Sequence, residues 1–99
     1  MARFEAAASL LASAIRRARI DRQVEAAGVL KTTSEWLEEQ WGEIGKTQAL
    51  PLKLEGGVLV IRTLNAGMAS EIRLCAQRLL TRIKERHSHT EVREIRVGL

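Results

Sequence analysis

The chain has few of the residues on which several protein functions depend. Its 99 residues include one cysteine, one proline, one phenylalanine, two tryptophans and no tyrosine. A single cysteine cannot form an internal disulfide, so we expect a protein of the cytoplasm. Only three aromatic side chains are present, and we expect both tryptophans to be buried. Base stacking, the usual means of holding single-stranded nucleic acid, therefore has little support.

Further absences concern membranes, enzymes and metals. No apolar run approaches the roughly 20 residues of a membrane-spanning helix. No aspartate follows Asp21, and no Ser, His and Asp stand in a recognisable catalytic motif. We therefore expect no enzyme, no catalytic residue and no cofactor. His87 and His89 form a pair without a further ligand at suitable spacing, so we expect no metal site either.

The length suits one small domain, and the positive charge is unevenly distributed. We predict a single domain over residues 1–99, with an N-terminal helical segment over 1–30 and a core over 31–99. Residues 1–50 carry seven basic and seven acidic side chains, whereas residues 51–99 carry nine basic and five acidic ones. Most basic residues are arginines, which favour bidentate contacts with phosphate or carboxylate. Nucleic-acid binding would explain the excess of basic residues in the second half, and a solvated Arg-rich surface explains it equally well.

The first half of the chain has helical periodicity. One apolar stripe at helical spacing comprises Phe4, Ala7, Ala8, Leu11, Ile15 and Ala18. Ile20 leaves this stripe and Asp21 can cap a helix, which predicts a break there, and Gly28 predicts a second weak point.

A separate acidic helix is predicted over residues 35–44. Thr33 and Ser34 can cap its first turn, and Gly45 can end it. Its predicted buried side comprises Trp36, Leu37, Trp41 and Ile44.

The second half of the chain predicts two strands, a helix and a third strand. Leu52 and Leu54 alternate with polar residues, Gly56 and Gly57 supply a tight turn, and Val58–Thr63 follows as a β-branched strand. Both faces of that strand are largely apolar, so it is either central and covered on each side or open to a partner. Asn65 can cap a helix over residues 66–87, and residues 92–97 close the unit. The predicted class is α+β: N-terminal helices, then β-β-α-β with a three-stranded sheet packed on helices.

Two glycine motifs resemble phosphate-binding sequences. Gly45-Lys46-Thr47 has the end of a P-loop, but Gln40 stands where the first glycine belongs and no strand precedes it. Gly42-Glu43-Ile44-Gly45 matches the bare G-x-x-G of KH domains, although its middle residues are acidic and apolar. Helix termination is the better explanation of these glycines.

The basic side chains of the second half form the candidate nucleic-acid site. Arg78, Arg82 and Arg86 recur every fourth residue and form a stripe on the long helix, with Arg73 and Lys84 on its other flank. Lys53, Arg62 and Arg96 lie on strands and can share one sheet face. Such a surface follows a phosphate backbone without reading bases. A solvated helix edge paired with Glu71 and Glu85 is an equal alternative.

Three apolar residues are candidates for partner binding. Leu74 projects opposite the core face of the long helix, where a polar residue is usual. With Val58 and Val60 it could form a docking patch, while coverage of Leu74 by the N-terminal helix is the favoured alternative.

The stretch Pro51–Val97 resembles the DciA-like family of bacterial replicative-helicase loaders. The residues that carry the likeness are Ala69, Ile72, Arg73, Leu74, Leu79, Leu80, Arg82 and Ile83, preceded by Pro51 and the Gly56-Gly57 hairpin. Met68 replaces a tryptophan of the family pattern. An upstream tryptophan of that pattern aligns with either Trp36 or Trp41, and both alignments stay open.

The resemblance implies a KH-like fold and a non-enzymatic role in DNA replication. Its implied partners are a DnaB-type replicative helicase and single-stranded or forked DNA, bound weakly and without sequence preference. Two alternatives stay open at this point: a small KH-like RNA-binding protein, and a protein-interaction or homodimerisation module.

Overall fold

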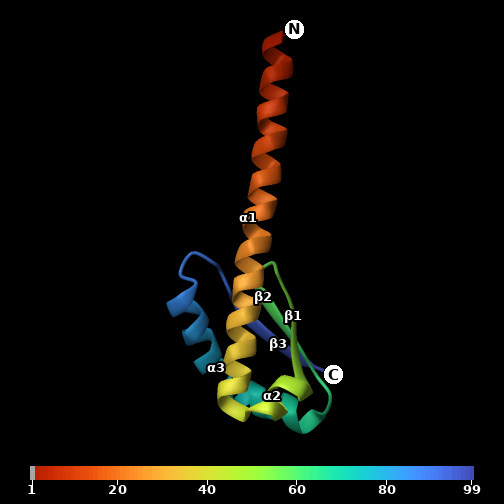
Figure 1. Cartoon of the computed structure of the whole chain (residues 1–99), viewed down its shortest axis with the longest axis vertical. Coiled ribbons are helices and arrows are strands. Elements are labelled where there is room, and N and C mark those ends of the chain that lie inside the picture. Colours follow the sequence, from red (N-terminus) through yellow and green to blue (C-terminus); the bar gives the residue numbers. More distant parts are fainter. Residues whose placement is uncertain (1) are drawn as a thin grey trace.

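The structure is a computed structural model that describes the backbone of residues 2–99 and the side chains of residues 6–99. A long N-terminal helix projects from a small body that contains the sheet and the other helices (Figure 1), and the whole extends over 62 × 25 × 21 Å. The elements are α1 (Ala2–Trp41), α2 (Glu43–Gln48), β1 (Ala49–Glu55), β2 (Val58–Thr63), α3 (Ala66–Arg86) and β3 (Glu94–Gly98). The predicted α+β class is confirmed, and the β-β-α-β order is that of a small KH-like domain.

Helix α1 is continuous, so the predicted breaks at Ile20 and Gly28 are wrong. A helix-interior glycine costs only about 1 kcal/mol relative to alanine, which a helix anchored at one end by packing tolerates. The predicted caps at residues 33 and 34 are also wrong. The Thr33 hydroxyl donates back to the Val29 carbonyl oxygen at 2.8 Å, inside the helix.

The N-terminal apolar stripe lies on a helix as predicted, but it is exposed. Phe4 falls outside the described side chains, and Leu11 and Ile15 are open to solvent. Eighteen residues make about five helical turns, so Leu11 lies on the same side of α1 as buried Val29. The stripe therefore prolongs the core-facing side of α1 beyond the body of the domain.

Helix α1 ends at Trp41, three residues before the predicted end. Gly42 adopts a φ of 63°, a left-handed value that favours glycine, and the chain turns there into α2. Ile44 therefore lies on α2 and is exposed, against the prediction that it is buried. Gly45 is buried against the Leu37 carbonyl oxygen, where a hydrogen atom fits and a Cβ would overlap.

The sheet has the order β1-β2-β3, which makes β2 central. Strands β1 and β2 form the predicted antiparallel hairpin, with positive φ at Gly56 and Gly57, and β3 pairs parallel to β2 after the α3 crossover. The register shifts between Pro51 and Lys53, which marks a β-bulge. Strand β3 starts two residues later than predicted.

Helices α1 and α3 cover one face of this sheet (Figure 1). The core between them comprises Val29, Trp36 and Leu37 from α1, Leu59 and Ile61 from β2, and Met68, Ile72, Leu79 and Ile83 from α3. The Asn65 side chain caps α3 as predicted, accepting a hydrogen bond from the Met68 amide at 2.8 Å. None of the described helices packs on the second face of the sheet, which we call the open face.

Candidate nucleic-acid and partner interface

The eight predicted cations fall into two groups on different layers of the domain. The helix group on α3 comprises Arg73, Arg78, Arg82, Lys84 and Arg86, and the strand group comprises Lys53, Arg62 and Arg96. The structure does not bring the eight side chains together into one surface.

The strand group lies on the open face. Lys53 and Arg96 are register neighbours of Val60, one on each side of the central strand. Lys53 is paired with Glu55 at 3.1 Å and Arg96 with Glu94 at 3.4 Å. Arg62 has no ion-pair partner among the described residues, so its charge is fully available.

Two arginines of the helix group connect α3 with α1. Arg82 pairs with Glu39 and Arg86 with Glu35, each at 2.9 Å. The pairing partners predicted on α3 itself are thus replaced by two glutamates one turn apart on α1. These two arginines therefore link α3 to α1 through ion pairs, in addition to contributing positive charge to the surface.

The rest of the helix group differs in its contacts. Arg73 donates to the Val97 carbonyl oxygen at 2.6 Å and so binds α3 to strand β3. Arg78 and Lys84 form no ion pair within the part of the chain that the structure describes. They are the two cations of α3 that a ligand could contact without displacing an internal partner.

Replacing Arg82 by alanine is expected to lower the free energy of unfolding by about 0.2–1 kcal/mol, because its ion pair is partly exposed. A double-mutant cycle with Glu39→Gln should return a coupling of the same size in urea denaturation. Arg78→Ala is the matched control and should leave stability nearly unchanged. Zero coupling between Arg82 and Glu39 would contradict the assignment.

The three predicted partner-binding residues do not form one patch. Leu74 is 86 % exposed, so the expectation that the N-terminal helix covers it is wrong. Helix α3 packs with its other side on the sheet, which places Leu74 on the outer side of that helix. Val58 and Val60 are half-buried on the open face, on the far side of the sheet.

The open face also carries exposed leucines that sequence reasoning missed. Leu50 lies beside Arg62 in the register, and Leu52 lies at the bulge in β1. In the sequence, Leu52 and Leu54 alternate with Lys53 and Glu55, and this pattern predicts that the two leucines lie on the same face of the strand. The bulge breaks that alternation and leaves Leu52 exposed.

The glycine motifs have structural roles. Gly42 ends α1, which agrees with helix termination as its explanation. Gly45 lies inside α2, so the expectation that it ends a helix is wrong, and its role is to let α2 pack against α1. Lys46 pairs with Glu38 at 3.7 Å, on a helix too short to form a phosphate site.

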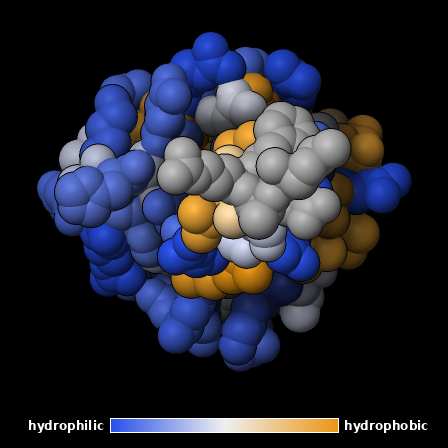
Figure 2. Space-filling model, turned by 90° about the horizontal axis from the view of Figure 1, so that it is seen from above, coloured by the Kyte–Doolittle hydropathy of each residue, from blue (hydrophilic) through white to orange (hydrophobic). Residues whose placement is uncertain are grey.

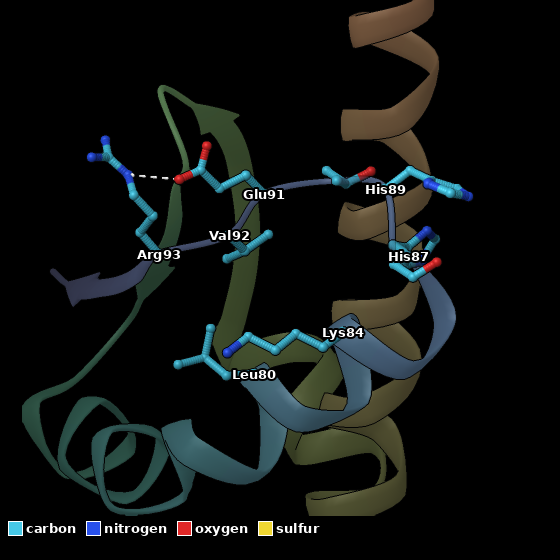
Figure 3. A pocket seen from close by; sticks show the side chains of 9 residues that line it. Leu80, Lys84, His87, His89, Glu91, Val92 and Arg93 are labelled. Atoms are coloured by element: carbon cyan, nitrogen blue, oxygen red, sulfur yellow. Dashed lines mark ion pairs between the residues drawn. The ribbon is translucent and has the colours of Figure 1, made fainter.

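A hollow of about 670 Å³ lies where α3 ends (Figure 3). His87 and His89 lie on its α1 side, and the Glu91 carboxylate points away from both, toward Arg93. The His87 Nε2 and the Thr32 hydroxyl are 2.7 Å apart, which ties the end of α3 to α1. Across the described residues, no three His, Cys, Asp or Glu side chains are arranged to hold a metal ion.

None of the described helices combines the length and the apolar character needed to cross a membrane.

Comparison of the sequence with known protein families places the chain in one of them. The family model described as "Dna[CI] antecedent, DciA" matches residues 7–97. The chain belongs to the DciA family. The match extends well beyond the Pro51–Val97 unit and includes most of α1. DciA proteins are adaptors that load the DnaB-type replicative helicase. No curated protein matches the chain by sequence.

Proposed function

We propose that this DciA-family protein binds a DnaB-type replicative helicase and helps to place it on DNA, without enzymatic activity of its own. The family match over residues 7–97 carries this proposal, because it spans α1, the sheet and α3 together. A replication factor acts where the chromosome is replicated, so we place the protein in the bacterial cytoplasm.

The helix group supports weak binding to single-stranded or forked DNA. Arg78 and Lys84 are available, and the exposed pairs of Arg82 and Arg86 can exchange a glutamate for a phosphate at small cost. Stacking has little support among the described side chains, because Trp36 is buried. Trp41 is half-buried, and its indole donates to Glu71 at 2.9 Å. Such binding depends on phosphate contacts and is therefore sensitive to salt and indifferent to base sequence.

The helicase role is tested with purified proteins. Immobilised full-length chain should retain the replicative helicase in a pull-down and should increase helicase loading on a single-stranded DNA circle. Failure of both would overturn the proposal. Parallel titrations with DNA and RNA of equal length distinguish the DNA role from the RNA-binding alternative, which requires tighter binding to RNA through 2′-hydroxyl contacts.

The DNA contact predicts a change in salt dependence. Replacing Arg78 and Lys84 together by alanine should reduce the slope of log affinity against log salt by about 1.4, since each phosphate contact on a single strand contributes about 0.7. Fluorescence anisotropy at several salt concentrations measures this slope for two unrelated oligonucleotides. Lys46→Ala on α2 is the control and should leave the slope unchanged. An unaltered slope in the double variant would remove α3 from the DNA interface.

A further inference from the structure

We infer that the open face of the sheet is a docking site for one acidic amphipathic helix of a protein partner. The surface is formed by Leu50, Leu52, Val60, Arg62, Arg96 and Leu99. The inference goes beyond helicase loading, because it follows from the chemistry of this surface whichever protein supplies the helix.

The apolar character of this face is the first observation. Leu50, Leu52 and Leu99 are 59 %, 42 % and 69 % exposed, and Val60 is half-buried between the strands. A hollow of about 280 Å³ is lined by Leu52, Val60 and Leu99. Figure 2 shows hydrophobic side chains on the side where β1 and the C-terminus lie in Figure 1 and also around the projecting helix, whereas the α3 side is mostly hydrophilic. A contiguous exposed apolar surface of this kind marks an interaction site.

The charge of the same surface selects an acidic partner. Arg62 and Arg96 both line the hollow, and Arg62 also lines a second one of about 250 Å³ with Leu50. The acidic residues of this face, Glu55 and Glu94, flank Val58 at the other end of the sheet. Carboxylates of a partner could therefore reach Arg62 without meeting a like charge. A second copy of this chain would instead bring the same arginines face to face, which is unfavourable.

The dimensions of the sheet suit one helix. Three strands spaced about 4.8 Å apart span about 10 Å, which is the diameter of an α-helix with its side chains. A helix laid on this face would bury the leucines and would complete a layer of helices on each side of the sheet. Nucleic acid suits the face less well, because leucines offer bases no aromatic platform.

The test uses full-length protein and two synthetic helical peptides of about 18 residues with leucines at helical spacing. One peptide carries glutamates on its polar side and the other carries lysines. Chemical-shift mapping of the isotope-labelled protein should show that the acidic peptide perturbs the amides of Leu52, Val60 and Arg96. Arg62→Glu should weaken the acidic peptide about tenfold and should strengthen the basic one.

Leu52→Asp should weaken the acidic peptide by a similar factor, and Ile20→Asp on the projecting part of α1 is the matched control without effect. Circular dichroism of each variant verifies that it is folded. Four results would each overturn the inference. Two of them are equal binding of both peptides and no binding at millimolar peptide. The others are chemical-shift perturbations elsewhere on the domain and, in sedimentation, self-association through this face. No helicase is present in this experiment, so failure of the helicase pull-down leaves its result unaffected.

Discussion

Trp36→Ala is expected to lower the free energy of unfolding by about 3–5 kcal/mol, the range for removal of a large buried aromatic side chain. Trp36 is only 1 % exposed, and its ring meets that of Trp41 edge-on, with centroids 5.5 Å apart and planes at 86°. It belongs to the core cluster formed by α1, the sheet and α3, so a cavity there would loosen the packing among these elements. Small domains are stable by about 5–15 kcal/mol, so this single change removes much of the total.

Urea denaturation followed by circular dichroism measures the loss. Trp36→Phe provides a second variant that keeps part of the ring packing and should show a smaller loss if the alanine variant does not fold. Trp41→Ala is the matched control, because Trp41 is half-buried and its removal should cost less than that of Trp36. A loss below about 1 kcal/mol for Trp36→Ala would contradict the central place of this residue in the core.

The sequence predicts the second half of the fold more accurately than the first. The Gly56-Gly57 hairpin and the Asn65 cap are local signals with strong conformational preferences, and both act as predicted. The supposed breaks in α1 depend on preferences of about 1 kcal/mol or less. Burial of Trp36 and Leu37 supplies more than that, so the helix continues through Gly28 and Thr33.

The two surfaces were predictable to different degrees. Glu35 and Glu39 stand four residues apart, as do Arg82 and Arg86, so matching charge spacing on two helices was a usable signal for the ion pairs that connect them. The exposure of Leu52 was not predictable in this way. It follows from a bulge, whose position depends on the pairing of two strands and not on alternation along one.

The separation of these surfaces bears on how an adaptor could work. The available cations Arg78 and Lys84 lie on α3, and the apolar open face with Arg62 lies on the other side of the sheet. DNA on α3 and a helix on the open face would therefore not compete for the same side chains. An adaptor with this arrangement could hold both ligands at once, and the two sets of variants proposed above should impair one binding event each.

Gly45→Ala tests the packing that turns the chain from α1 into β1. Alanine is about 1 kcal/mol more favourable than glycine inside a helix, so propensity alone predicts stabilisation. A Cβ at this position, however, would overlap with the Leu37 carbonyl oxygen and would press on the Trp41 Cβ at 3.2 Å. The carbonyl belongs to the backbone of α1 and cannot rotate away as a flexible side chain would.

We therefore expect a net loss of about 1–3 kcal/mol for Gly45→Ala, the cost of overpacking in a close-packed site. Gly67→Ala in the first turn of α3 is the matched control, because its nearest neighbour, the Asn65 Oδ1, would be in ordinary contact at 3.4 Å. The same substitution should thus stabilise the protein at Gly67 and destabilise it at Gly45. Urea denaturation of the two variants compares them directly, and stabilisation at both positions would show that α2 is not held against α1 as the structure has it.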